Sequence, residues 1–355
     1  MSVPAPVLPR RRRSASDRAG GSVCGVPRPE PAELVDAARR GDRSALARLL
    51  SAIERGGDGA RAVGRATHGL GRDAYAVGIT GAPGAGKSTL TNALVDLLRV
   101  RDEPVAVLAI DPSSPFSGGA ILGDRVRMGD HALDDGVFIR SMATRGHLGG
   151  LAVAAPEAVR VLTAAGYPWV LLETVGVGQV EVEVVGQADT TVVVVNPGWG
   201  DAVQANKAGL MEIADVFVVN KADRPGAKET ARDLDRMLDM APPGRTWRPP
   251  VVCATATSGE GVPEVWQAIA DHRAHLEADG GLDERRRQRA ADEVTRLVAA
   301  RLLARGRAVM AQPRAAELAE AVAAGDLDPW AAADDLLGDT LPAHDGPADS
   351  PTPDA

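Results

Sequence analysis

The chain has 355 residues, of which 45% are hydrophobic, so it can bury a sizeable core without disulfides or structural metals. Its formal net charge of −8 gives it no overall basic field that would attract nucleic acid or an anionic membrane. The two cysteines, Cys24 and Cys253, are far apart, which argues against a disulfide framework or a zinc finger. No apolar stretch approaches the roughly 20 residues of a membrane span. We therefore expect a soluble, cytoplasmic protein that binds neither nucleic acid nor membrane.

Both ends of the sequence read as tails. Residues 1–28 are rich in Pro, Gly, Ser and Arg and lack apolar periodicity, which predicts disorder; a Ser- and Arg-rich composition is also typical of an organellar transit peptide. Residues 341–355 are rich in Pro and Asp and should also be disordered. Over residues 29–70, apolar residues spaced by three and four predict a helical extension with two amphipathic helices separated at Gly41.

Residues 71–280 alternate short β-branched runs with helical stretches. Several runs are apolar on both faces, as expected of strands in a parallel sheet that is covered on both sides. Helices between them, such as Ser88–Leu98, would serve as crossovers. The pattern predicts an α/β fold with a doubly wound, mostly parallel sheet of about seven strands. The predicted strands are Ala74–Thr80, Val105–Ile110, Val137–Arg140, Trp169–Glu173, Thr190–Val195, Val216–Asn220 and Pro250–Cys253.

Residues 281–340 predict a helical arm. A long Arg-rich helix with apolar residues at helical spacing, among them Val294, Val298 and Leu302, would be followed by two shorter helices, Ala315–Ala324 and Trp330–Leu337. The apolar stripe needs a surface to pack against. That surface could be the sheet domain or a second copy of the chain, and the sequence leaves both possibilities open.

A complete G-x-x-x-x-G-K-[ST] motif stands between the first predicted strand and an amphipathic helix, the context that a phosphate-binding P-loop requires. Its glycines let backbone N–H groups surround phosphate oxygens at a helix N-terminus, Lys87 would reach the β- and γ-phosphates, and Ser88 would bind Mg²⁺. Lys87 is also one of only four lysines among 40 basic residues. An ordinary Gly-rich turn is the alternative. The motif comprises Gly81, Ala82, Pro83, Gly84, Ala85, Gly86, Lys87, Ser88 and Thr89.

A second motif points to guanine as the base of the nucleotide. Asn220, Lys221 and Asp223 form an N-K-x-D sequence at the end of a predicted strand. The carboxylate of such an Asp can accept hydrogen bonds from the N1–H and 2-amino groups of guanine, and adenine lacks both donors. GTP and GDP are therefore favoured over adenine nucleotides. The loop after the last strand, with Ser258 and Gly259, is placed to form a second contact with the base.

Acidic residues near predicted strand ends are candidates for a Mg²⁺ site and for hydrolysis. Asp111 and Glu173 stand at the ends of two strands, and Asp124 lies in a Gly-rich segment between them. Carboxylates there would hold Mg²⁺ directly or through water, and Gly176 would offer an N–H to the γ-phosphate. Each acid taken alone could instead cap a helix or lie on the surface. The candidates for stabilising transition-state charge, for which an ordinary surface role is the alternative, are Arg125, Arg127 and Arg145.

In order and spacing, these motifs resemble the MeaB/ArgK family of methylmalonyl-CoA mutase-associated GTPases over about Pro31 to Leu337. The matching strings include R-S-M-A-T-R-G-H-L-G-G from Arg140, and the most specific are D-P-S-S-P-F-S-G-G-A-I-L-G-D from Asp111 and E-T-V-G-V-G-Q from Glu173. The resemblance implies a P-loop GTPase that uses Mg²⁺ and is a homodimer through its C-terminal arm. It also implies a chaperone of an adenosylcobalamin-dependent acyl-CoA mutase, which gates cofactor loading and protects that enzyme. The P-loop lysine and the three acids would then carry hydrolysis.

The resemblance also places the family's third switch, the segment that couples nucleotide state to the mutase, at residues 196–207. The sequence departs from the family pattern there at Trp199 and Asn206, so the client could be methylmalonyl-CoA mutase or a mutase of another branched acyl-CoA. Trp199 between two glycines suits a flexible loop that carries one large apolar contact, or a loop residue packed on its own domain. The expected switch residues are Gly176, Gln179, Trp199, Asp201, Gln204 and Lys207.

Two other functions fit parts of the pattern. A nickel-delivering metallochaperone GTPase would carry Cys/His clusters, whereas the six histidines here are scattered. A P-loop kinase linked to arginine or ornithine transport would need an acceptor site, which the sequence does not identify. No D-x-H-x-x-G cobalamin signature occurs, so we expect cobalamin to belong to the partner mutase. We expect hydrolysis of GTP to GDP and phosphate, slow until a partner completes the site.

Overall fold

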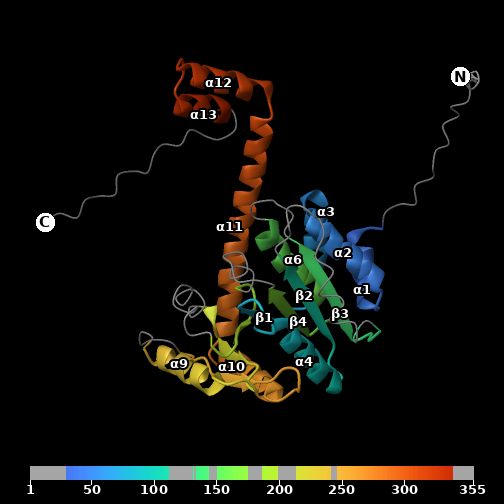
Figure 1. Cartoon of the computed structure of the whole chain (residues 1–355). Helices are drawn as coiled ribbons and strands as arrows, with labels where there is room; N and C mark the ends of the chain where they lie inside the picture. The colour runs from blue at the N-terminus through green and yellow to red at the C-terminus, as the bar shows by residue number, and fades with distance from the viewer. Residues whose placement is uncertain are drawn as a thin grey trace, which may run out of the picture.

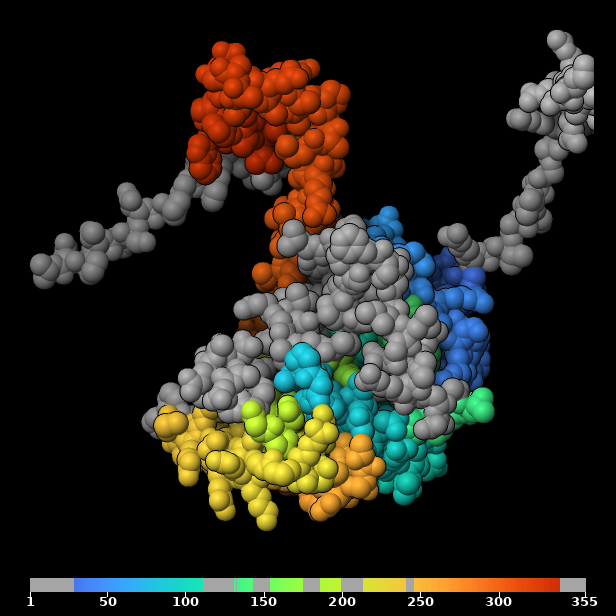
Figure 2. Space-filling model, in the orientation of Figure 1, coloured from blue at the N-terminus to red at the C-terminus, as the bar shows by residue number. Residues whose placement is uncertain are grey.

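The computed structural model of the chain describes residues 29–111, 131, 133–143, 150–174, 186–198, 213–240 and 246–338. Within these ranges a central sheet has helices on both faces, and one long helix runs away from it and carries two short helices at its far end (Figure 1). Figure 2 shows the outer part of that long helix standing clear of the body of the molecule.

Over the described residues the sheet has seven strands, all parallel, in the order β3-β2-β4-β1-β5-β6-β7. This confirms the predicted doubly wound α/β fold. β1 lies in the middle between β4 and β5, and ligands of such sheets bind outside the carboxyl ends of the strands, where the strand order reverses. The strands are β1 (Tyr75–Gly81), β2 (Val105–Asp111), β3 (Val137–Ala143), β4 (Trp169–Thr174), β5 (Thr190–Val195), β6 (Val216–Asn220) and β7 (Val251–Ala254).

Alternate residues of the strands enter cores on opposite faces of the sheet. Val192 and Val194 of β5 pack with α4 (Lys87–Val100) and α10 (Val262–Ala278), whereas Val193 and Val195 pack with α9 (Ala227–Asp239). Burial on both faces explains the continuous run of valine in this strand. A third apolar cluster joins β2 and β4 to four further helices, which are α1 (Pro31–Arg39), α2 (Arg43–Arg55), α3 (Gly57–Thr67) and α6 (Gly150–Ala164).

The N-terminal extension contains three helices, where the sequence predicted two. α3 follows α2 after Gly56, whose φ of 70° suits glycine. Glycines within α3 lower its helix propensity and interrupt its apolar pattern, so the sequence did not predict this helix. Ala60 and Val63 are nevertheless buried in the cluster shared with α2 and α6, so tertiary packing stabilises this helix.

Ion pairs with two buried aspartates fix the root of the long helix α11 (Gly281–Met310) to the amino ends of β5 and β6. Arg285 forms a bidentate pair with Asp215 at 2.9 and 3.1 Å, and Arg286 lies 3.0 Å from Asp189. Burial by itself would raise the pKa of Asp189, but the hydrogen bond from Arg286 and the charge of Arg289 hold that pKa below its usual range. Because removing one partner would leave a buried charge unpaired, this cluster fixes where the arm leaves the sheet.

Beyond its root, α11 presents apolar side chains to solvent. In the part of the chain that the structure describes, no residue of this helix is buried, and Val294, Val298, Leu302 and Leu303 are each exposed by half or more. The two predicted short helices are present as α12 (Pro313–Ala324) and α13 (Pro329–Leu337). Over the described ranges, we find no helix with the length and apolar character needed to cross a membrane.

The buried His272 next to this cluster predicts a loss of stability in mild acid. Its Nδ1 lies 2.8 Å from Thr190 Oγ1, its Nε2 lies 3.3 Å from Asp215, and burial lowers its pKa to about 4. The unfolded chain therefore takes up a proton near pH 6.5 that the folded chain resists until about pH 4. We expect the free energy of unfolding to fall by about 3 kcal/mol across that window, at about 1.4 kcal/mol per pKa unit.

Urea unfolding followed by tryptophan fluorescence between pH 7.5 and pH 4.5 measures this effect. A His272→Asn variant should lose most of the pH dependence in that window, whereas His68→Asn, at an exposed site, should behave like the unaltered protein. Asp189 does not confuse the result, because a carboxylate with a lowered pKa affects stability only near and below its ordinary value of 3.8. An identical pH dependence in the His272 variant would contradict the prediction.

Candidate nucleotide-binding site

The P-loop motif lies where the sequence predicted, between the carboxyl end of β1 and the start of α4. Gly81 has a φ of 140°, and a Cβ there would lie 1.9 Å from the carbonyl oxygen of Val194 on β5. Gly86, with a φ of 93°, would place a Cβ 2.3 Å from the side-chain nitrogen of Asn220. Both positions therefore require glycine, because neighbouring backbone or a buried amide occupies the space of any side chain.

Lys87 is the first residue of α4 and is buried. Its Nζ donates hydrogen bonds to the carbonyl oxygens of Gly81 at 2.7 Å and Ala82 at 3.1 Å. The ammonium group is thus held within the loop that the motif predicts to enclose phosphate. A compact cation in that place, next to the N-terminus of a helix, favours a bound anion.

Ser88 and Glu173 come together beside the P-loop. The Ser88 hydroxyl donates a hydrogen bond to the Glu173 carboxylate, which is buried on β4. Glu173 stands in register between Ile79 of the P-loop strand and Ala109 of β2. Hydroxyl and carboxylate oxygens are ligands that suit Mg²⁺, so these two residues fit the predicted metal site. Asp111 ends the adjacent strand β2, which places its backbone beside them, but its side chain lies outside the described residues.

The predicted base-reading motif also holds the P-loop in place. The buried side chain of Asn220 donates to the carbonyl oxygen of Ala85 at 2.8 Å and accepts a hydrogen bond from the backbone N–H of Ala256 at 3.1 Å. Lys221 has a φ of 58° and donates from Nζ to the carbonyl oxygen of Gly84 at 2.6 Å. Asp223 follows on the surface and is exposed. Asn220 and Lys221 of the N-K-x-D motif therefore organise the P-loop.

The loop after β7 is closed by its own hydrogen bonds. The backbone N–H groups of Ser258 and Gly259 both donate to the carbonyl oxygen of Thr255, and the N–H of Thr255 donates to Glu260. The backbone N–H groups of Ser258 and Gly259, the two residues predicted to contact the base, are therefore used in hydrogen bonds within the loop. The loop predicted to contact the base begins at Ala256, and the N–H of Ala256 donates a hydrogen bond to the Asn220 side chain. The sequence did not reveal this bond, because the only signal at Ala256 was its place just beyond the last strand.

Several predicted residues cannot be placed. They lie outside the part of the chain that the structure describes, so their roles stay predictions. They are Asp124, the candidate arginines Arg125, Arg127 and Arg145, and the switch residues Gly176, Gln179, Trp199, Asp201, Gln204 and Lys207. Within the described ranges, no group of three or more His, Cys, Asp or Glu side chains is arranged to hold a metal ion.

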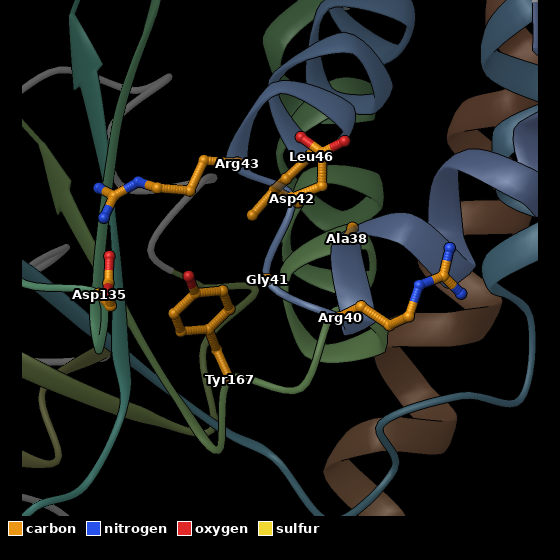
Figure 3. A pocket seen from close by; sticks show the side chains of 8 residues that line it. All are labelled: Ala38, Arg40, Gly41, Asp42, Arg43, Leu46, Asp135 and Tyr167. Atoms are coloured by element: carbon orange, nitrogen blue, oxygen red, sulfur yellow. The ribbon is translucent and has the colours of Figure 1, made fainter.

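A separate cavity of about 350 Å³ lies between the turn that joins α1 to α2 and Tyr167 (Figure 3). Its polar side chains are used by the fold: Asp42 caps α2, and Arg43 donates to the carbonyl oxygen of Asp134 at 3.0 Å. Figure 3 shows Arg40 and Arg43 pointing in opposite directions, so the two cations do not converge on a ligand. We therefore interpret this cavity as a packing gap between the helical extension and the sheet domain.

The chain is similar to known proteins over most of its length. Residues 46–311 match the profile of the family described as methylmalonyl Co-A mutase-associated GTPase MeaB. The chain belongs to this family. A putative GTPase of Pyrococcus abyssi is 48% identical over 87% of the chain and 96% of that protein. GTPase ArgK of Escherichia coli is 38% identical over 74% of the chain and 81% of that protein.

Two further comparisons extend the picture of this MeaB-family chain. A mouse protein named methylmalonic aciduria type A homolog, mitochondrial, is 37% identical over 60% of the chain and 52% of that protein. A crystal structure described as a LAO/AO transport system kinase superposes with a TM-score of 0.65 at 28% identity, and covers 87% of the chain and 96% of that structure. The P-loop nucleotide-binding fold and GTP hydrolysis are therefore supported at the level of the family.

Replacing Gly86 with alanine should damage the site more than replacing Gly84. Both residues have a positive φ, but a Cβ at Gly86 would meet the Asn220 amide, whereas a Cβ at Gly84 would meet nothing within 4 Å. We expect Gly86→Ala to lower the free energy of unfolding by about 2 to 3 kcal/mol, and Gly84→Ala by about 1 kcal/mol from backbone strain alone. Urea unfolding of the two variants compares them directly. Equal losses would show that the contact with Asn220 does not constrain the loop.

Proposed function

We propose that this protein hydrolyses GTP to GDP and phosphate with Mg²⁺. The observation that carries the proposal is the P-loop assembled on α4, with Lys87 inside the loop and Ser88 in contact with Glu173. In this proposal Lys87 draws the β- and γ-phosphates into the loop. Ser88 and Glu173, together with Asp111 and the unplaced Asp124, would hold Mg²⁺, which when bound neutralises charge on the phosphates.

The base is selected by the segment at the end of β6. Asp223, exposed beyond the P-loop clamp of Asn220 and Lys221, would accept hydrogen bonds from the guanine N1–H and 2-amino groups. A site built around a carboxylate rejects adenine, because the carboxylate would then lose its donors on desolvation. GTP and GDP are therefore the proposed nucleotides.

The proposed client is an adenosylcobalamin-dependent acyl-CoA mutase, and methylmalonyl-CoA mutase is the favoured candidate. The support is the description of the family, and the name of the mouse relative is in keeping with it. The protein would gate cofactor loading and protect the mutase, with residues 175–180 and 196–207 as the segments that report nucleotide state. Cobalamin would be bound by the mutase alone, and the complex would act in the cytoplasm. We propose division of the chain into tails 1–28 and 341–355, a helical extension 29–70, a GTPase domain 71–280 and an arm 281–340.

Turnover of GTP by the purified protein, alone and with the adenosylcobalamin-dependent mutase of the same source, tests this function. We expect slow hydrolysis of GTP that the mutase accelerates, and no comparable turnover of ATP. Lys87→Ala should lower turnover by about 100-fold or more, because one buried positive charge that faces the phosphates is lost. Lys228→Ala is the matched control, since Lys228 is exposed on α9 and should leave turnover unchanged.

The results separate the two layers of the proposal. Hydrolysis that the mutase does not alter would keep the GTPase and reject this client. Normal turnover by Lys87→Ala would reject the site. Transfer of the γ-phosphate to arginine or ornithine in place of water, measured with labelled GTP, would instead favour the kinase function.

We also propose that the arm forms a homodimer. Its support is the apolar side of α11, where Val294, Val298 and Leu302 recur every four residues and are each exposed by half or more. Surfaces of this kind on an extended helix are typical of contacts between copies.

A charge placed on the apolar side of α11 should break this dimer. We expect Leu302→Glu to halve the mass measured by light scattering, because a buried carboxylate in an apolar contact is costly. Ala304→Glu introduces the same charge at an exposed position two residues away and should leave the dimer intact. A monomer in the unaltered protein, or an unchanged mass in Leu302→Glu, would contradict the proposal.

A further inference from the structure

Two threonine hydroxyls are buried together beneath the P-loop. Thr80 on β1 and Thr174 on β4 are both fully buried, and the Thr174 hydroxyl donates a hydrogen bond to that of Thr80 at 3.0 Å. Each hydroxyl is removed from water on folding, and the hydrogen bond between the two offsets part of that cost.

The pair lies where the chain leaves the sheet to form the nucleotide site. Thr80 precedes Gly81, the first P-loop glycine, and Thr174 is the last residue of β4, directly after Glu173. On the other side of β4, Thr174 stands in register with Ile110, the residue before Asp111. The hydroxyl pair thus joins the P-loop strand to the strand that carries Glu173, at the last residue of β4 and the next-to-last residue of β1.

The other edge of β1 is fixed in a different way. The absence of a side chain at Gly81 lets β1 approach the carbonyl oxygen of Val194 on β5. On the edge of β1 that pairs with β4, Ile79 is in register with Glu173. One residue further along both strands, the side chains of Thr80 and Thr174 are hydrogen-bonded to each other. A shift of β4 at this point would move the Glu173 carboxylate away from the Ser88 hydroxyl.

We infer that Thr80 and Thr174 are positioning residues for GTP hydrolysis. Their hydrogen bond fixes the end of β4 against the P-loop strand, and so keeps the Glu173 carboxylate within hydrogen-bonding distance of the Ser88 hydroxyl. The pair acts on the rate of the chemical step more than on nucleotide binding. The P-loop that binds phosphate is carried by β1 and α4, whereas the pair sets the distance between that loop and the carboxylate on β4. This inference rests on the GTP hydrolysis proposed above.

The decisive variant is the double replacement Thr80→Val with Thr174→Val. Replacing both partners of a buried hydrogen bond by apolar groups of the same shape is nearly neutral for stability. We therefore expect an unchanged urea midpoint, an affinity for GDP and a KM for GTP within about twofold, and a kcat lowered about tenfold, since small misplacements of reacting groups have effects of this size or larger. Thr80→Ser keeps the hydroxyl and should keep kcat within about twofold.

A matched control and the unaltered protein complete the test. Thr67→Val also removes a buried hydroxyl, one that bonds to the carbonyl oxygen of Val63 within α3, and should leave kcat unchanged. If the double variant folds and its kcat equals that of the unaltered protein, the positioning role is overturned. A rise in KM with an unchanged kcat would overturn it as well. Absence of GTP turnover in the unaltered protein would instead overturn the proposed function, and this inference with it.

Discussion

The side-chain amide of Asn220 ties together three segments that are far apart in the sequence. Its nitrogen donates to the carbonyl oxygen of Ala85 in the P-loop, and its oxygen accepts from the N–H of Ala256 beyond β7. A buried amide that satisfies both of its polar ends in this way is specific about distance and direction. The phosphate loop, the base motif and the last loop of the site are therefore one unit, and Gly86 is needed because the amide occupies the space beside it.

Ion pairs lie at the opposite end of the same strands, their amino ends. Asp215 precedes β6 and Asp189 precedes β5, and arginines at the root of α11 pair with both carboxylates. Asn220 ends β6, so one strand has the arm fixed at its amino end and the nucleotide motif at its carboxyl end. A second contact, between Arg160 of α6 and Glu293 at 2.6 Å, joins the arm to α6. The arm is thus attached to the sheet that carries the site.

The family and the geometry support each other at the level of a GTPase. The MeaB profile covers residues 46–311, which includes the P-loop, Glu173 and the N-K-x-D motif. In the structure those motifs meet at one end of the sheet through hydrogen bonds that their sequence spacing does not reveal. The contact of Ser88 with Glu173 spans 85 residues of sequence, and that of Asn220 with Ala85 spans 135.

The sequence by itself determined the order of the strands and of most helices, and it located the motifs predicted to bind phosphate and base. Runs of β-branched residues bounded by turns identified all seven strands, and Gly81 to Thr89 carries its chemistry within nine consecutive residues. Short-range patterns suffice there because hydrophobic periodicity and a P-loop are local properties.

Tertiary structure decided the rest. The pairing of Thr80 with Thr174, the role of Ala256, the third helix of the extension and the arginine pairs at the root of α11 all depend on strand order and register. Side chains at neighbouring strand ends are brought together by the sheet, and the distance between them along the chain does not encode that contact.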